Sequence, residues 1–386
     1  MSTDAVGARG GEVELAALST ILVHGPVSRT ALAERLALSQ STMTRAVKPL
    51  IERGLVYETS EALEGPGRPS RPLVGAPGDR RYGGAKLTGD EVFAVVTDML
   101  AREIAAGRRA LTSHEPRQVA RDVAELLTEL SAGEPLVGAG VSLGGSAADG
   151  RTVDRAPFLE WRGVPLAALI EEELVGVPVV VDNDLSALTA GEHWFGEARG
   201  LADFAVVTIG AGIGLGLVRH DQVVRSRDMG LGLAGHVPLE PVGPRCFAGH
   251  RGCSTALLSI PSIEAQAGVA LRRTVAFDEV LALAASGEPV CAEIVDSAAR
   301  GLGRLLAMVA NLAMVDVIVV SGEGLAVLDV AETEMRAQLA EDRDPEAHPL
   351  DLRLDRSGFS RWARGAATVA IQASLPTLLR APVSPR

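Results

Sequence analysis

The sequence lacks the features of a membrane-spanning or secreted protein. It contains no run of about 18 uncharged apolar residues, which a bilayer-crossing helix needs. Its first residues, Met1 to Gly11, show no basic segment followed by an apolar one, so no secretion signal is expected. The three cysteines, Cys246, Cys253 and Cys291, are too few for a disulfide framework, and an odd number cannot all be paired. With 47% hydrophobic and 22% charged residues, we expect a folded, cytoplasmic protein.

The chain also lacks an overall positive charge, because its formal net charge is −12. This balance is uneven. Residues 1–81 hold 10 Lys/Arg and 9 Asp/Glu, a net charge of +1, so the remaining 27 basic and 40 acidic residues give −13. An acidic whole can therefore include a small module that binds nucleic acid, and the count permits DNA binding without demonstrating it.

Composition divides the chain into three segments. Residues 1–73 read as short helices followed by a Gly/Pro/Arg-rich stretch, residues 74–84 as a linker, and residues 85–386 as an α/β domain. The predicted strands of that domain are Val92–Leu100, Leu136–Leu143, Pro178–Val181, Phe204–Ile209, Gly214–Arg219 and Val315–Val320. The predicted helices are Pro116–Ala132, Pro165–Val175, Asp184–Phe195, Ile294–Leu312 and Phe359–Leu375. Because the order of strands and helices occurs twice, two similar lobes are expected.

Three short helices are predicted in the N-terminal segment. They span Val13–Val23, Thr30–Leu36 and Gln40–Arg53. Ser28 and Ser39 stand where N-caps are expected, and Gly54 where a C-cap is expected. Pro49 lies inside the third helix and is expected to kink it.

The third helix carries a polar face opposite its apolar one. Hydroxyls, an amide and cations of this kind contact phosphates and base edges in the major groove. The predicted DNA-binding residues here are Ser39, Gln40, Ser41, Thr42, Thr44, Arg45 and Lys48. Three short helices with this face on the third form a helix-turn-helix. The alternative is a packing module whose polar face is only solvated.

A wing is predicted directly after the third helix. Leu55–Thr59 reads as its first strand, and Glu64–Leu73 supplies the turn. Arg68 and Arg71 each precede a proline, which favours extended backbone. Arginines in such a loop suit insertion into a narrow, A·T-rich minor groove, so both are predicted to contact DNA. The wing favours DNA binding over the packing alternative.

The large domain carries three chemical motifs. Thr208–Gly216 (TIGAGIGLG) is a Gly-rich turn that either approaches a phosphate or forms a structural hairpin. Asn183 and Asp184 follow a strand, where an α/β domain binds ligands. Further along, Cys246 and Cys253 lie seven residues apart, a spacing found among metal ligands.

Taken in order, the motifs resemble the ROK family of bacterial repressors, unassigned reading frames and sugar kinases. LSQSTMTRAVKPLIERGLV followed by GRP looks like the helix-turn-helix and wing of the repressor branch. The kinase's catalytic-Asp segment resembles VDNDLSALTAGEHWFGEARG, and its second phosphate loop resembles TIGAGIGLG. The family's zinc-and-sugar signature resembles GHVPLEPVGPRCFAGHRGC, and its adenosine-side motif resembles VVSGEGL. The resemblance implies an actin-like (ribonuclease-H-like), two-lobed, sugar-kinase-type fold. Lobe one would cover residues 85–185 and 359–380, and lobe two residues 186–358.

The chain departs from the kinase pattern at five positions. Where the kinases open the domain with a D-x-G-G phosphate loop, Lys86 stands for the Asp and Thr88 for the first Gly. The loss of this carboxylate removes an anchor for metal and phosphate. Phe158, Leu233 and Thr255 replace three residues that contact sugar in the family. The resemblance therefore implies no ATP binding and no catalytic residue.

A residual ligand site and a damaged metal site remain. Asn183, Asp184 and His236 match the family's sugar site, and Asp184 is either a vestigial general base or a helix cap. His236, Cys246 and Cys253 match three of the family's four zinc ligands, while Ala248 replaces the fourth and His250 falls two residues further on. The alternatives are an incomplete zinc site and a loop that holds two inert thiols.

The sequence therefore predicts a transcriptional regulator of the repressor branch. A homodimer or homotetramer would bind an A·T-containing inverted repeat in double-stranded DNA, modulated by a sugar or another small effector. No membrane partner is expected. Two alternatives stay open: a sugar kinase, favoured by Asp184 and the Gly-rich turn, and a protein-docking module, favoured by the eroded pocket.

Overall fold

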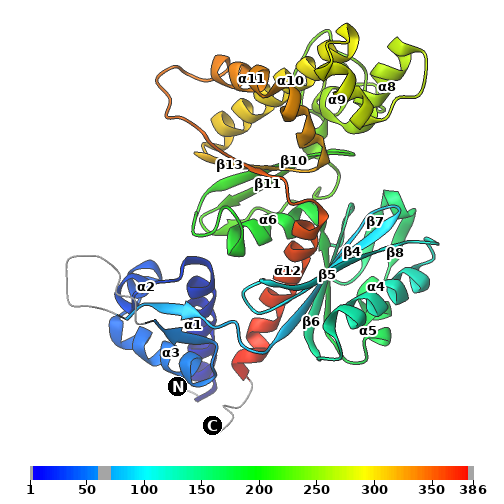
Figure 1. Cartoon of the computed structure of the whole chain (residues 1–386). Coiled ribbons are helices and arrows are strands. Elements are labelled where there is room, and N and C mark those ends of the chain that lie inside the picture. Colours follow the sequence, from blue (N-terminus) through cyan, green and yellow to red (C-terminus); the bar gives the residue numbers. More distant parts are fainter. Residues whose placement is uncertain (1–2, 60–70, 381–386) are drawn as a thin grey trace. The chain divides into compact units, whose positions relative to one another are not determined.

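The computed structural model describes residues 3–59 and 71–380 and divides the chain into two compact units (Figure 1). Unit 1 comprises residues 1–200 and 359–386, and unit 2 comprises residues 201–358. Among the described residues, none of the helices combines the length and the hydropathy needed to cross a bilayer.

The N-terminal module of unit 1 contains three helices and a two-stranded sheet. Its elements are α1 (Thr3–His24), α2 (Arg29–Arg35), α3 (Gln40–Glu52), β1 (Val56–Glu58) and β2 (Leu73–Gly75). Ser28 and Ser39 cap α2 and α3 through their side-chain oxygens, which accept the amides of Ala31 and Thr42. Gly54 takes the left-handed conformation after α3, with φ of +64°. The predicted helix-turn-helix is confirmed.

The proline at position 49 does not end the helix, because α3 continues through this residue to Glu52. Only one further turn follows the proline, and the apolar face of the helix is anchored on both sides of it. Met43, Val47 and Leu50 are fully buried in the module's core. Packing therefore holds the last turn of α3 in place.

Strands β1 and β2 pair antiparallel, with Tyr57 opposite Val74, and form the predicted wing. The predicted linker over residues 74–84 needs correction, because β2 uses its first residues and β3 (Arg81–Leu87) uses its last. Its glycines provide close packing. A Cβ atom on Gly84 would lie 2.1 Å from the carbonyl oxygen of Ala363. Only residues 76–80 separate the two strands.

The rest of unit 1 is built on a five-stranded sheet in the order β5-β4-β3-β6-β9. The further strands are β4 (Glu91–Thr97), β5 (Glu103–Ala110), β6 (Leu136–Leu143) and β9 (Val179–Asn183). Strands β3, β6 and β9 are parallel, and β4 and β5 continue the sheet antiparallel. A hairpin of β7 (Val153–Ala156) and β8 (Trp161–Val164), joined by η1 (Pro157–Leu159), lies beside α4 and α5 (Figure 1).

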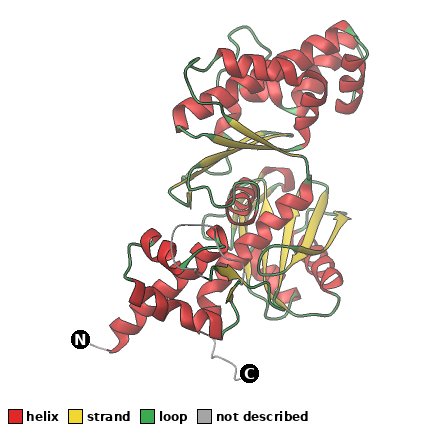
Figure 2. Cartoon of the chain, turned by 60° about the vertical axis from the view of Figure 1, so that its left-hand side comes forward, coloured by secondary structure: helices red, strands yellow, loops and turns green. Residues whose placement is uncertain are grey.

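Helices cover both faces of this sheet (Figure 2). They are α4 (Pro116–Ser131), α5 (Leu166–Glu173), α6 (Asp184–Phe195) and α12 (Phe359–Arg380). Side chains alternate between the faces of a strand. Accordingly, Val92 and Ala94 of β4 share a core with α4, whereas Val95 packs against Ala363 and Ala367 of α12.

Helix α12 lies directly on the sheet and on α6. A Cβ atom on Gly140 of β6 would lie 1.9 Å from the carbonyl oxygen of Ala366, and one on Gly365 would lie 2.6 Å from that of Ala187 in α6. Only glycine permits these approaches. Farther along, Ile371 and Leu375 of α12 join the core of the N-terminal module.

Unit 2 contains a second five-stranded sheet, in the order β12-β11-β10-β13-β14. Its strands are β10 (Phe204–Ile209), β11 (Ile213–Arg219), β12 (Gln222–Val223), β13 (Val317–Ser321) and β14 (Asp351–Asp355). Its helices are α7 (Ser254–Leu258), α8 (Ile260–Leu271), α9 (Phe277–Ala285), α10 (Pro289–Ala313) and α11 (Leu328–Glu341), with short turns η2 (Leu233–His236) and η3 (Glu323–Val327). The predicted actin-like, two-lobed α/β class agrees with these two sheets.

The boundary expected between the lobes needs correction. Helix α6, assigned from the sequence to lobe two, belongs to unit 1 because it packs on α12, and the chain crosses between the units at Gly200/Leu201 and Gly358/Phe359. One strand also ends earlier than predicted. The strand predicted to Leu100 ends at Thr97, where the Asp98 carboxylate accepts the amides of Leu100 and Arg102 and turns the chain into β5.

Candidate functional sites

The polar face of α3 is open to solvent. Gln40, Ser41, Thr44, Arg45 and Lys48 are exposed, and Thr42 is half-buried near the cap. The opposite face provides the core of the module. A rigid helix therefore presents a continuous polar stripe, as the reading of a major groove requires.

Hydroxyl groups gather at the N-terminus of α3. The Ser39 hydroxyl lies 3.0 Å from that of Ser41 and 2.9 Å from that of Thr42. The Thr44 hydroxyl donates to the carbonyl oxygen of Gln40 over 2.9 Å. These contacts fix the first turn, where backbone N–H groups and the helix dipole favour a phosphate.

The cations around α3 fall into two groups. Arg29 pairs with Glu58 of the wing, and Arg53 pairs with Glu14 of α1 over 3.6 Å. These two pairs connect the elements of the module. Lys48 reaches Glu52 over 3.8 Å, but its side chain stays 77% exposed. Within residues 3–59 and 71–380, Arg45 forms no ion pair, and its Nε donates to the Ser41 carbonyl oxygen over 3.3 Å.

Of the two arginines predicted in the wing, the described residues include Arg71. Arg71 is exposed at the start of β2, beside buried Pro72. Arg68 lies outside the described residues. The wing prediction for Arg71 thus rests on an exposed cation next to an antiparallel pair that continues from α3.

The end of β9 in unit 1 holds a buried ion pair. The Lys86 ammonium contacts the Asp184 carboxylate, and the Lys86 side chain is only 6% exposed. The ammonium also lies 5.1 Å from the ring centroid of Trp362 in α12, a cation–π position. The sequence named Lys86 as the loss of a phosphate anchor, but it did not indicate this pairing. Asp184, the match to the kinase's catalytic residue, is thereby neutralised from within the protein.

Asn183, and not Asp184, is the N-cap of α6. Its side-chain oxygen accepts the Ser186 amide over 3.1 Å, and its side-chain amide donates to the Gly145 carbonyl oxygen over 2.9 Å. Asp184 follows as the first helical residue. Both residues are therefore held by their own unit, next to the half-exposed ring of Phe158, whose edge lies near Gly144.

The Gly-rich turn of unit 2 is a hairpin between β10 and β11, with Ile209 opposite Ile213. A carboxylate lies against it. A Cβ atom on Gly210 would lie 2.6 Å from Oε2 of Glu323, at the start of η3. An acidic oxygen at this distance disfavours an anionic phosphate on the turn. Sequence reasoning missed Glu323, although it lies within the VVSGEGL motif.

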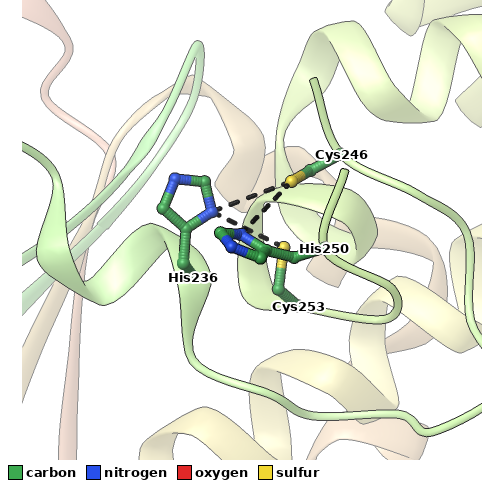
Figure 3. A group of neighbouring side chains, drawn as sticks. All are labelled: His236, Cys246, His250 and Cys253. Carbon is green, nitrogen blue, oxygen red and sulfur yellow. Dashed lines mark hydrogen bonds between the residues drawn. The ribbon is translucent and has the colours of Figure 1, made fainter. Parts of the chain in front are cut away.

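His236, Cys246, His250 and Cys253 come together in unit 2 (Figure 3). Their ligand atoms all lie within 4.8 Å of one another. Cys246 Sγ is 3.8 Å from Nδ1 of both His236 and His250, and Cys253 Sγ is 3.9 Å from Nδ1 of His236. The predicted residues His236, Cys246 and Cys253 lie together, and His250, two residues after Ala248, brings a fourth side chain with a potential ligand atom to the group.

A tight loop brings His250 into the cluster. The Cys246 amide donates to the His250 carbonyl oxygen over 2.9 Å, and Gly249 adopts φ of +86° between them. Burial raises the pKa of the Cys246 thiol, but the amides of Ala248, His250 and Gly249 and the Cys253 thiol outweigh it, so the pKa lies below its usual value. This environment favours a thiolate.

The distances suit a zinc ion. With Zn–S of about 2.3 Å and Zn–N of about 2.0 Å, a tetrahedral site separates neighbouring sulfur and nitrogen ligands by about 3.5 Å. Two thiols and two imidazoles are a donor set that zinc commonly takes. Leu233 and Thr255, at the family's sugar-contact positions, flank this segment, the first 63% exposed and the second buried.

One contact that the sequence did not indicate connects the turn after α6 to the N-terminal module. The Arg199 guanidinium donates to the carbonyl oxygen of Leu22 over 3.0 and 3.2 Å and to that of Gly25 over 2.9 Å. Burial lowers the pKa of Arg199 from its usual value. The arginine thus satisfies carbonyl groups at the C-terminal end of α1.

Two family models match the chain. That of the ROK family matches residues 82–373, and that of the MarR family matches residues 12–61, the part that contains the helix-turn-helix. The DNA-binding transcriptional repressor Mlc of Escherichia coli (strain K12) is 26% identical over 305 residues, which cover 75% of each chain. The glucokinase of Thermotoga maritima is 39% identical over 160 residues, 40% of this chain and 50% of that enzyme.

A solved structure resembles nearly the whole chain. It is a ROK family transcriptional regulator described as a homolog of the Escherichia coli Mlc protein. The TM-score is 0.77 at 22% identity, with 96% of this chain and 98% of that chain covered. At this identity the match shows a shared fold, including the N-terminal module.

Proposed function

The chain belongs to the ROK family, and on this basis we propose that it is a DNA-binding transcriptional regulator of the repressor type. The observation that carries the proposal is the exposed polar stripe of α3, followed by an antiparallel wing. The relative Mlc, which shares 75% of its length with this chain, is named a transcriptional repressor. The target is a double-stranded operator with an A·T-containing inverted repeat, bound by a homodimer or homotetramer.

The kinase alternative is opposed by two charges in the sites that kinases use. Lys86 occupies the position of a metal-anchoring carboxylate and pairs with Asp184, so this carboxylate is not free to accept a sugar proton. Glu323 lies against the Gly-rich turn. The observation that favours the kinase is the similarity to a glucokinase over 160 residues. It is tested by incubating the chain with ATP and hexoses, for which no phosphorylated sugar is expected.

The kinase-like domain is proposed to sense a sugar or another small effector. The residues at the positions of the family's sugar site are Asn183, Asp184 and His236. An effector that prefers one arrangement of the units would change the affinity for DNA by that preference. A DNA affinity that no member of a broad sugar panel alters would contradict this part of the proposal.

We further propose that unit 2 holds one structural zinc ion through His236, Cys246, His250 and Cys253. The four donors converge at distances compatible with tetrahedral coordination. A structural zinc closed by four protein ligands supplies folding free energy and no reactive water. Its role would be to hold the loop over residues 236–253.

The test of the regulator is a selection of bound fragments from a library of random DNA duplexes, with the purified full-length chain. An enriched inverted repeat is expected. The variant Arg45→Glu/Lys48→Glu, which reverses the charge of the α3 stripe, should enrich nothing. Arg108→Glu, an exposed cation on β5, should select the same repeat as the unchanged chain. No enrichment by the unchanged chain would overturn the proposal.

A further inference from the structure

The exposed face of α3 contains one arginine whose terminal nitrogens are free to donate. Arg45 and Lys48 are the cations of this face, and Lys48 is directed toward Glu52. Within the described residues, Arg45 makes no ion pair, and its recorded hydrogen bond uses only Nε. A guanidinium has five N–H groups, so four remain, on two adjacent nitrogens.

The neighbouring hydroxyls are already engaged. Thr44 donates its proton to the Gln40 carbonyl oxygen, and Ser39, Ser41 and Thr42 contact one another. Since a hydroxyl has one proton, Thr44 is left as an acceptor. Arg45 is the one side chain of the stripe that carries N–H groups on two terminal nitrogens in a planar fork. Its Nε bond to Ser41, one turn earlier, also fixes the plane of the guanidinium before DNA binds.

We infer that Arg45 reads a guanine in the major groove, donating from its two terminal nitrogens to O6 and N7. Guanine presents two neighbouring acceptors on that edge, whereas adenine presents one acceptor and one donor. A phosphate also accepts a guanidinium, but the position of Arg45 on the groove-facing side of a recognition helix favours a base edge. The inference rests on the proposed function and adds a guanine to each half of the A·T-containing repeat.

The first experiment compares the motif selected by the unchanged chain with that selected by Arg45→Ala and by Lys48→Ala. Arg45→Ala should still select the repeat but lose the preference for guanine at one symmetric pair of positions. Lys48→Ala should select the unchanged motif with uniformly weaker binding, as expected for a phosphate contact. Equal thermal unfolding of the three proteins establishes that both variants are folded.

The second experiment changes the base and keeps the protein. Replacing the assigned guanine with 7-deazaguanine removes N7, and replacing it with inosine keeps both O6 and N7. For the unchanged chain, the first should weaken binding roughly 5- to 150-fold and the second should have little effect. Arg45→Ala should bind all three duplexes about equally.

The outcomes separate the guanine assignment from the proposed function. If the unchanged chain selects a repeat in which Arg45→Ala keeps every guanine, or if the two proteins respond alike to 7-deazaguanine, the assignment is overturned while the regulator stands. A selected repeat with no guanine also overturns the assignment. If the unchanged chain selects no sequence, the proposed function itself fails, and the assignment fails with it.

Discussion

The α3 stripe and the end of β9 use charged side chains in opposite ways. On α3, polar groups face solvent, and the terminal nitrogens of Arg45 have no recorded partner within the described residues. At β9, the buried ammonium of Lys86 contacts Asp184 and lies over Trp362. The first arrangement keeps its hydrogen-bonding capacity for a ligand, whereas the second consumes it inside the protein. Within unit 1, the two regions therefore differ in whether their charged side chains stay available to a ligand.

A second contrast concerns the two positions, 86 and 248, at which the chain departs from the family pattern. Lys86 replaces a carboxylate with the opposite charge, and its new partner is the carboxylate that catalysis would need. Ala248 removes a metal ligand, but His250 enters the cluster from two residues further on. One motif holds an ion pair, and the other gathers four side chains that carry potential ligand atoms.

The largest effect is expected from a charge in the core of the N-terminal module. Val47→Asp places a carboxylate at a position with no solvent exposure, where an unpaired charge is strongly destabilising. Binding to the selected operator should be abolished, while the zinc content of unit 2 should stay the same. Fluorescence anisotropy and elemental analysis of one preparation measure both. A parallel loss of zinc would show that the two regions are not independent.

Removal of His250 should come next. His250→Ala leaves three ligands and should lower zinc affinity roughly 100- to 1000-fold, in proportion to one of four bonds. The double variant Ala248→Cys/His250→Ala should recover most of the zinc affinity, because it places a thiol where the family has a cysteine. His348→Ala, an exposed histidine of unit 2, is the control. Competition with a zinc chelator gives the affinities, and undiminished binding by His250→Ala would exclude its role as a ligand.

Disruption of the buried pair should have an intermediate effect. Lys86→Met leaves the Asp184 carboxylate without its cation and should lower the free energy of unfolding by about 2 kcal/mol, less than for a fully buried pair because Asp184 keeps 18% exposure. Adding Asp184→Asn should restore part of the loss. Lys48→Met changes the only other lysine and should change the free energy of unfolding by less than about 0.5 kcal/mol. Urea titrations measure the free energy of unfolding of each variant. An equal decrease in Lys86→Met and Lys48→Met would contradict a stabilising role of the Lys86–Asp184 pair.

The smallest effect is expected at Arg199. Arg199→Ala leaves the carbonyl groups of Leu22 and Gly25 without their donor and should cost about 1.5 kcal/mol. Hydrogen exchange should accelerate at the end of α1 and in the turn that follows. Arg108→Ala breaks an exposed pair with Glu91 and should leave this exchange rate unchanged. An unaltered rate in Arg199→Ala would show that Arg199 does not stabilise the end of α1 from the turn after α6.

Local features of this chain were readable from the sequence. The caps at Ser28 and Ser39, and the end of α3 before Gly54, depend on neighbouring residues, and the bounds of α6 and β10 agree with the predicted ones. The polar stripe of α3 follows from helical periodicity in the same way. The predicted zinc ligands His236, Cys246 and Cys253 also lie together.

Only the tertiary structure decided which distant groups meet. Lys86 and Asp184 are 98 residues apart, and no local pattern indicates that β3 and the end of β9 bring them into contact. Helix α6 belongs to unit 1 because glycines let it approach α12, which follows it by more than a hundred residues. His250 lies beside His236, Cys246 and Cys253 because the backbone turns at Gly249, which has a φ of +86°. Periodicity and capping are short-range effects, whereas pairing and convergence depend on packing of the whole chain.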